Sequence, residues 1–194
     1  SDTKRVFLTF DDGPSPVTSK ILDILKQENV KATFFILGSN VDSRKDVVKR
    51  MYEEGHYLAN HGYSHTYSKI YSSPQSVLDE YNECNDKVKN AIEVPDYNSH
   101  LFRFPGGLAG GKYAEIKKEA KELLLQNNIV NVDWNALTGD AETNNLSVEF
   151  EMTRLTETME SKNSLVILMH DAAAKSVTAD ALPQIIAKLK EEGY

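Results

Sequence analysis

The sequence has one cysteine, Cys84, among 194 residues, so no disulfide can form within the chain. Cysteine usage therefore does not identify the compartment, and an exported protein and a cytosolic one both remain open. Cys84 falls on an apolar stripe of helical spacing, which favours a core residue over a nucleophile.

Long hydrophobic runs are also absent. No stretch approaches the roughly 18 apolar residues that a membrane span needs, so we expect no membrane contact from this domain itself. The sequence begins Ser-Asp-Thr, without an initiator methionine or a basic-then-apolar signal. We expect it to be a piece of a longer precursor whose targeting segment has been removed.

Positive charge is scarce, with 22 Lys and Arg against 29 Asp and Glu and a formal net charge of -7. This balance argues against a nucleic-acid partner, and the lack of a cluster of basic phosphate clamps argues against a phosphatase or nuclease. Hydrophobic residues make up 40% and charged residues 26%, which is ordinary globular usage. Without visible linkers or repeats, residues 1–194 are expected to form one domain, acting as a monomer.

Short apolar runs alternate with segments of helical period along the whole chain. The expected strands are Arg5–Phe10, Lys31–Leu37, His56–His61, Leu101–Phe104, Ile129–Trp134 and Leu165–His170. The expected helices cover Val17–Glu28, a segment capped by Ser43 and stopped at Gly55, a segment from Ser73-Pro74 to Ile92, Tyr113–Gln126, a segment after Ser147, and Ala179–Glu192.

This order predicts an α/β fold with parallel strands joined by crossover helices, either an open sheet or a barrel. A complete eightfold barrel needs about 250 residues, so a barrel of this length must be deformed or incomplete. The sequence ends directly after a helix, where one more strand would follow. The last strand of the barrel is therefore expected to be missing from this sequence or to lie beyond it.

Titratable residues gather at the ends of the expected strands. Asp11 and Asp12 follow the first strand, and His61 and His65 come at and after the end of the third. The later strands and their loops contribute Arg103, Asp140 and His170. Because the carboxyl ends of parallel strands meet at one edge, which is where ligands bind in such folds, we expect these residues to converge.

The residue types suggest a metal site, although each motif alone has a plainer explanation. An Asp-Asp-Gly run can be a simple Asx turn, and two histidines four residues apart are common by chance. Together, Asp12, His61 and His65 make a three-ligand set that leaves positions open for water and substrate. His170 could be a core histidine, or it could be a general acid opposite a metal-bound water.

Four motifs in this order resemble the polysaccharide deacetylases of carbohydrate esterase family 4, also called the NodB homology domain. They are Thr9–Pro14 (TFDDGP), His61-x-x-x-His65, Arg103–Pro105 (RFP) and Leu168–Asp171 (LMHD). The resemblance spans nearly the whole chain. It implies a deformed (β/α) barrel and a hydrolase that removes acetyl groups from polysaccharides with one divalent metal ion, zinc in most cases, with cobalt, nickel or manganese as alternatives.

The resemblance assigns a role to each matching residue. Asp12, His61 and His65 would be the metal ligands, Asp11 the catalytic base and His170 the acid.

The same resemblance places further residues around this centre. Arg103 would hold and tune Asp11, and Asp140 would tune His170. Leu168 would help to form the pocket for the acetyl methyl group. A backbone N–H just after Pro105 would hold the oxyanion.

The sequence departs from the family pattern in two motifs. The family commonly has an aromatic residue after Arg103-x-Pro105, where this chain has Gly106, so a wall of the groove is missing or is supplied elsewhere. The family's Asp-Trp pair reads Asp140-Ala141 here, and the single tryptophan, Trp134, comes six residues earlier. Pro105, Gly106, Leu168 and Trp134 are the expected substrate-binding residues.

For the substrate we expect an acetylated polysaccharide, with N-acetylglucosamine or N-acetylmuramic acid units of peptidoglycan first. The expected site of action is outside the cell or at the cell wall. The alternatives are an O-acetyl esterase on acetylxylan and a catalytically silent carbohydrate-binding domain.

Overall fold

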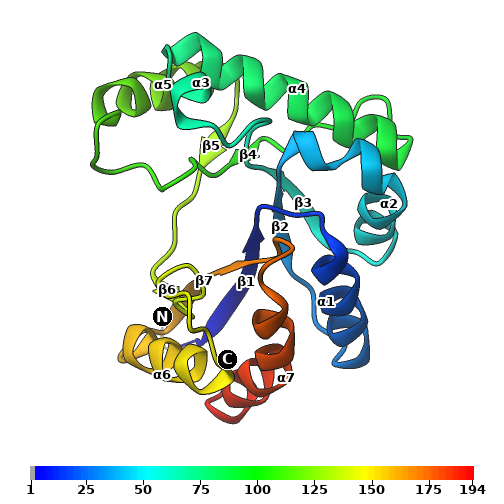
Figure 1. Ribbon diagram of the computed structural model, residues 1–194, viewed down its shortest axis with the longest axis vertical. Coiled ribbons are helices and arrows are strands. Elements are labelled where there is room, and N and C mark those ends of the chain that lie inside the picture. Colours follow the sequence, from blue (N-terminus) through cyan, green and yellow to red (C-terminus); the bar gives the residue numbers. More distant parts are fainter. Residues whose placement is uncertain (1–2) are drawn as a thin grey trace. The chain divides into compact units, whose positions relative to one another are not determined.

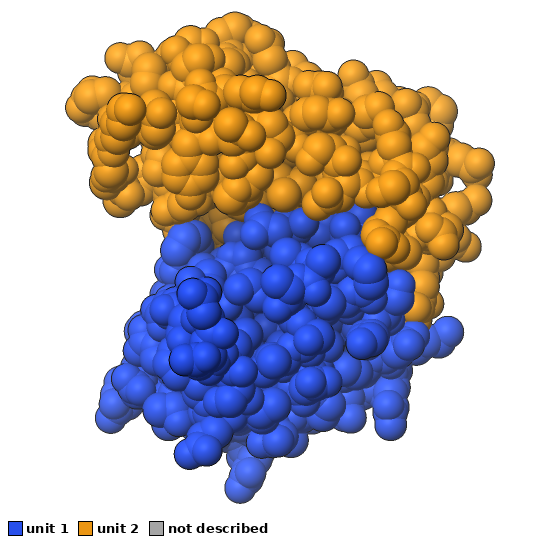
Figure 2. Space-filling model, in the orientation of Figure 1, with its two compact units in different colours: residues 1–33, 134–194 blue, residues 34–133 orange. Residues whose placement is uncertain are grey.

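The computed structural model describes residues 3–194, so the first two residues, Ser1 and Asp2, lie outside the described part. The chain divides into two compact units, coloured separately in Figure 2. Unit 1 consists of residues 1–33 and 134–194, and unit 2 of residues 34–133. The expectation that residues 1–194 form one domain stays a prediction.

The sheet of unit 1 is built on two long parallel strands, β1 (Arg5–Asp11) and β7 (Ser164–His170). They are in register along their whole length, from Arg5 beside Ser164 to Asp11 beside His170. The short strand β6 (Ala136–Leu137) extends the sheet on the other side of β7, also in parallel. Both long strands were predicted, whereas β6 lies in a segment predicted as a loop, because two residues are too few to show a period.

Three helices accompany these strands in unit 1 (Figure 1): α1 (Pro16–Gln27), α6 (Val148–Met159) and α7 (Ser176–Glu191). Ser15 begins α1 with a capping box, and Ser147 caps α6 by accepting the N–H of Phe150. The last helix starts three residues before the predicted Ala179. Its first turn buries the polar Thr178, which a hydrophobic pattern does not mark.

Unit 2 carries shorter strands: β2 (Thr33–Ile36, whose first residue belongs to unit 1), β3 (Tyr57–Asn60), β4 (Leu101–Phe102) and β5 (Val130–Asn131). They follow one another in this order, and the pairs β3/β4 and β4/β5 are parallel. The strand expected over Ile129–Trp134 is reduced to two residues. The side chain of Arg103 bonds the carbonyls of Val132 and Asp133, which are then not available to a further strand.

The helices of unit 2 are α2 (Lys45–Glu53), α3 (Tyr67–Ile70), α4 (Pro74–Ile92) and α5 (Ala114–Gln126), with two single 3₁₀ turns, η1 (Gly38–Asn40) and η2 (Asp42–Arg44). The prediction that Ser43 caps α2 is wrong. Ser43 lies inside η2 and its hydroxyl donates to the carbonyl of Asn40, so the 3₁₀ turn replaces a capped start. Gly55 does follow α2 with a positive φ of 86°, as a helix stop should.

Cys84 lies in the core of unit 2, as predicted. Its side chain is fully buried on α4, and its Sγ donates to the carbonyl of Ile36 at 3.2 Å. Burial raises the pKa of this thiol, so the thiolate needed for a nucleophile does not form readily. Among the described residues, no helix combines the length and apolar character that crossing a bilayer requires.

A buried carboxyl group lies where α6 packs against α7 in unit 1. Glu151 has no exposed surface, and the hydroxyl of Thr178 on α7 lies 3.2 Å from its Oε1. Burial and the nearby charge of Asp140 raise the pKa of Glu151 from 4.5 to about 7, and the charge of Lys175 offsets only part of this. The folded protein therefore holds a proton here that the unfolded chain releases.

Replacing the Glu151 carboxyl by an amide tests whether Glu151 holds this proton, through the free energy of unfolding. Because the folded-state pKa lies above the unfolded value, the free energy of unfolding should fall as pH rises from about 4.5 to about 7, and the loss should persist above pH 7. Glu151→Gln cannot ionise. We expect the variant to match the wild type near pH 5 and to exceed it by about 1–3 kcal/mol at pH 8, measured by denaturant unfolding.

Glu149→Gln, an exposed position on the same helix, is the matched control and should leave the pH dependence unchanged. A constant stability difference between Glu151→Gln and the wild type at pH 5 and pH 8 would contradict a proton held by Glu151.

Candidate active site

In unit 1, a carboxylate and an imidazole stand side by side at the carboxyl ends of two strands. Asp11 ends β1, His170 ends β7, and the two are direct neighbours in the parallel register. Side chains in register on adjacent strands project to the same side of a sheet. Asp11 is buried and His170 is partly buried, so both groups are partly shielded from solvent.

Asp171 holds the loop after β1 through hydrogen bonds to both of its carboxylate oxygens. Its Oδ1 accepts the N–H of Gly13 at 3.0 Å, and its Oδ2 accepts the hydroxyl of Thr18 at 2.6 Å. A Cβ on Gly13 would lie 2.0 Å from Asp171 Oδ2, so only glycine fits there. This contact fixes the path of the backbone that carries Asp11 and Asp12, the latter with a positive φ of 82°.

Asp171 has a structural role that the sequence did not indicate, although it stands beside His170 in the fourth motif. It is buried, and burial raises its pKa to about 7, with the charges of Asp12 and Asp11 adding to the effect and the hydrogen bonds from Thr18 and Gly13 opposing it. Only the three-dimensional contact with Gly13 reveals what it does.

Asp140 and His170 are brought together in unit 1. Asp140 Oδ1 lies 2.7 Å from His170 Nδ1, and its Oδ2 accepts the His170 backbone N–H at 2.8 Å and the hydroxyl of Thr178 at 2.8 Å. Lys175 Nζ donates to the Asp140 carbonyl at 2.7 Å. A carboxylate can only accept, so His170 Nδ1 carries a proton and Nε2 is the nitrogen that can exchange one with a ligand.

The charges around His170 favour its protonated form. Burial lowers the pKa of His170, but the hydrogen bond and charge of Asp140, with the charges of Asp11 and Asp12, outweigh burial and raise the pKa to about 9. The side chain is therefore suited to donate a proton at neutral pH. Its role as an acid, and that of Asp140 in tuning it, stay predictions.

In unit 2, the two histidines of the second motif face each other after β3. The ring centroids of His61 and His65 are 5.4 Å apart. His61 Nδ1 lies 2.6 Å from the carbonyl oxygen of Arg103, which can only accept, so Nδ1 carries the proton and Nε2 presents a lone pair. A metal-binding histidine is oriented in the same way, by donating its second ring N–H to a fixed acceptor.

Glu80 on α4 holds the segment between these histidines. Its Oε1 accepts the backbone N–H groups of Tyr63 and Ser64 at 2.8 and 2.9 Å, and its Oε2 accepts the Ser64 hydroxyl at 2.6 Å. The sequence analysis missed Glu80, because a glutamate on an amphipathic helix 15 residues after His65 carries no signal of this contact. His65 itself has a positive φ of 56°, so the turn needs such support.

Arg103 is the largest fully buried side chain of unit 2. Its Nε and one terminal nitrogen donate to the carbonyls of Val132 and Asp133 at 3.1 and 2.9 Å, and its guanidinium lies 4.1 Å from the centre of the Phe35 ring. These contacts fix the guanidinium in place. The contact with Asp11 that the resemblance implies stays a prediction.

The turn after Arg103 carries the predicted residues Pro105 and Gly106. The carbonyl of Pro105 accepts the hydroxyl of Tyr71 at 2.6 Å, and the N–H of Gly107 closes the turn onto the carbonyl of Phe104 at 2.8 Å. Gly106 has a positive φ of 81°. The turn is therefore tied to the end of α3 by the buried tyrosine that directly follows this helix.

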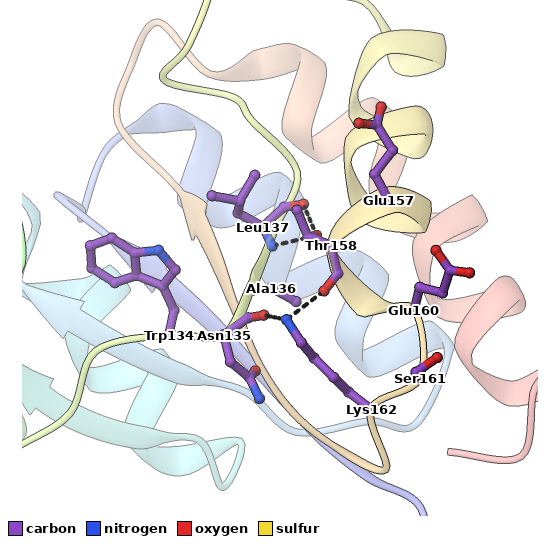
Figure 3. A pocket seen from close by; sticks show the side chains of 9 residues that line it. All are labelled: Trp134, Asn135, Ala136, Leu137, Glu157, Thr158, Glu160, Ser161 and Lys162. Atoms are coloured by element: carbon purple, nitrogen blue, oxygen red, sulfur yellow. Dashed lines mark hydrogen bonds between the residues drawn. The ribbon is translucent and has the colours of Figure 1, made fainter.

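The two remaining predicted residues lie in different parts of unit 1. Leu168 is on β7, paired with Leu137, two residues before His170. Trp134 precedes β6 and lines an open hollow of about 530 Å³ beside the last turn of α6, in which Lys162 donates to the carbonyl of Asn135 (Figure 3). Trp134 thus lies at the amino end of β6, whereas Asp140 follows its carboxyl end, and a substrate contact for Trp134 stays a prediction.

The donor types of the expected ligand set suit a divalent metal. Asp12 offers a carboxylate oxygen, and His61 and His65 each offer a ring nitrogen. Two histidines and one carboxylate are a catalytic zinc set, and the orientation of His61 through the Arg103 carbonyl agrees with it. The residues present therefore fit the group that the motifs imply.

Comparison with known proteins gives concordant results. A family model described as polysaccharide deacetylase matches residues 1–126. The Bacillus subtilis protein YheN is 38% identical over 98% of this chain, which covers 65% of YheN. A Bacillus cereus peptidoglycan-N-acetylglucosamine deacetylase is 34% identical over the full chain, which covers 68% of that protein. This chain therefore spans about two thirds of each of these two relatives.

Solved structures agree with the sequence relatives. The structure of a Streptococcus mutans family 4 carbohydrate esterase has a TM-score of 0.90 and 36% identity, covering 99% of this chain and 84% of the esterase. The predicted fold class, a parallel α/β fold of the deformed (β/α) barrel type, is confirmed by this match. With the motifs, the family model and the solved structure in agreement, this chain belongs to the polysaccharide deacetylase family.

Proposed function

We propose that this chain is a metal-dependent hydrolase that removes acetyl groups from N-acetylglucosamine or N-acetylmuramic acid units of peptidoglycan. The observation that carries the proposal is the placing of Asp11 beside His170 at the ends of β1 and β7, because these are the residues that we assign as base and acid. The named activity of the Bacillus cereus relative supports the substrate. Such an enzyme would work outside the cell or at the cell wall, and as a monomer.

The metal would be held by Asp12, His61 and His65, with zinc the expected ion and cobalt, nickel or manganese as substitutes. A divalent ion bound by these residues supplies Lewis-acid chemistry, lowering the pKa of a bound water and polarising a carbonyl group. The proton on His61 Nδ1, fixed by the Arg103 carbonyl, leaves Nε2 for the ion.

Two side chains of unit 1 would move protons. Asp11 takes the proton of the attacking water, with Arg103 holding its carboxylate in position. His170 gives its proton to the departing amine, and Asp140 keeps it protonated until then.

Backbone and apolar groups would bind the acetyl unit itself. The N–H of Gly107 is used within its turn, so the N–H of Gly106 is the donor that we assign to the developing oxyanion. Leu168, two residues before His170 on the same strand, would contact the acetyl methyl group. Pro105 sets the path of the turn that presents Gly106.

Acetate release tests the proposed function. Metal-free protein, and protein restored with zinc or cobalt, would be incubated with N-acetylglucosamine oligomers, peptidoglycan and acetylxylan. We expect release from the first two substrates only with metal, and none from Asp11→Asn. Release confined to acetylxylan would make the protein an O-acetyl esterase, and tight metal binding without release from any substrate would make it a silent binding domain.

The ligand and acid assignments predict different phenotypes. Asp12→Ala should lose both bound zinc and activity, because a carboxylate ligand is removed. His170→Ala should retain zinc and lose about 10²–10⁴-fold in kcat, the usual contribution of a general acid. Zinc content by mass spectrometry and kcat on oligomers separate the two, with Asp180→Ala, exposed on α7, as the control. Full activity in either variant would refute its assignment.

Removing the charge of Asp140 should shift the pH profile. Asparagine keeps an oxygen near His170 Nδ1 but no longer stabilises its positive charge, so the pKa of His170 should fall from about 9. Since the acid must be protonated, the alkaline limb of kcat/KM should move to lower pH in Asp140→Asn by about one unit or more. A limb at the wild-type position would show that Asp140 does not tune the group that limits the rate.

A further inference from the structure

An exposed tyrosine stands beside one of the proposed metal ligands in unit 2. Tyr67 begins α3, two residues after His65, and its ring centroid lies 5.7 Å from that of His65. The Tyr67 residue is 39% exposed, although its ring also packs edge-on against Tyr71 at 5.5 Å. An aromatic ring so placed offers a surface to whatever approaches His65.

The absence of a side chain at Gly106 leaves room for the Tyr67 ring. A Cβ added to Gly106 would lie 2.5 Å from the Tyr67 hydroxyl oxygen and 3.2 Å from its ring carbon Cζ. The positive φ of 81° at Gly106 disfavours any other residue for a second reason. A side chain at position 106 and the present position of Tyr67 therefore exclude each other.

Tyr71 ties the ring and the turn into one rigid assembly. Its hydroxyl donates to the Pro105 carbonyl at 2.6 Å, and its ring packs on Tyr113 at 5.5 Å. Lys117 Nζ lies 5.1 Å from the centre of the Tyr71 ring and donates to the Gly107 carbonyl at 2.9 Å. Tyr67 is held against Tyr71, so its position is set by buried contacts and not by its own exposure.

Packing against neighbouring residues covers only part of Tyr67. The adjacent core already contains Tyr71, Phe102 and Phe104, each at most 1% exposed, whereas Tyr67 leaves a large part of its surface in solvent. Ligand sites are lined by aromatic rings with a few polar groups that fix orientation, and a tyrosine supplies both an apolar face and a hydroxyl.

We propose that Tyr67 is a substrate-binding residue whose ring forms the aromatic wall of the sugar site, packing against the pyranose ring of the acetylated unit. Gly106 is the partner position that makes room for it. This inference rests on the proposed function, because it assumes that an acetyl sugar is bound next to His65. Tyr67, the first residue of α3, then supplies the aromatic surface that the turn at Gly106 lacks.

Kinetics on N-acetylglucosamine tetramers test the proposal with the zinc-loaded protein. Tyr67→Ala should raise KM about tenfold, equivalent to 1.4 kcal/mol of binding free energy, with kcat changed less than about threefold. Tyr67→Phe keeps the ring and should recover most of the affinity. Gly106→Ala should raise KM by displacing the ring, and it should also lower kcat because the Gly106 N–H is the assigned oxyanion donor. Adding Tyr67→Ala to it should raise KM little further, because both changes remove the same contact.

Tyr52→Ala is the matched control, since Tyr52 is also exposed, at 41%, and packs edge-on against another tyrosine. Zinc content is measured in every variant. An unchanged KM in Tyr67→Ala, or a loss confined to kcat with loss of zinc, would overturn the proposal, the second because it shows support of His65 only.

A wild type that releases no acetate from any substrate would refute the proposed function. The role of the Tyr67 ring is then tested separately, by measuring the affinity for the tetramer by calorimetry. Tetramer binding that is weakened about tenfold in Tyr67→Ala supports the sugar wall without catalysis. Equal affinity of the wild type and Tyr67→Ala, or no tetramer binding by the wild type, overturns it.

Discussion

The parallel pairing of β1 with β7 is the constraint on which the chemistry of unit 1 depends. These strands are seven residues long and matched end to end, so the last residue of one cannot move relative to the last residue of the other without breaking the ladder. Asp171 extends the constraint beyond the strands, because its backbone N–H donates to the Asp11 carbonyl and its side chain holds Gly13. The positions of Asp11 and His170, the proposed base and acid, are thus set by backbone hydrogen bonds.

Unit 2 achieves comparable rigidity by a different route. Its strands are short, so side-chain hydrogen bonds position the loops where no long strand pairing is present. Glu80 holds the turn between the two histidines, the Arg103 carbonyl orients His61, and the Arg103 side chain binds the carbonyls after β5. Arg103 therefore orients His61 with its backbone carbonyl and holds the adjoining loop with its side chain, which explains why so large a cation is fully buried.

The sequence predicts those parts of the structure that depend on local pattern. Strands β1 and β7 are apolar runs long enough to recognise, and Ser73 marks a helix start that the structure confirms. The candidate site residues were proposed because their motifs stand at strand ends, and their roles stay predictions. The contacts of Glu80 and Asp171, the two-residue strand β6 and the 3₁₀ turn around Ser43 depend on partners far away in the chain or on segments too short to show a period, so no local pattern could indicate them.

The isolation of Cys84 has a consequence for the chemistry of the whole chain. The single thiol is enclosed in unit 2 and hydrogen-bonded to Ile36, so neither oxidants nor alkylating reagents can reach it while α4 stays packed. Two copies of the folded protein cannot cross-link through sulfur. Because only opening of this core exposes the thiol, the reaction of Cys84 with a reagent would report the opening of unit 2.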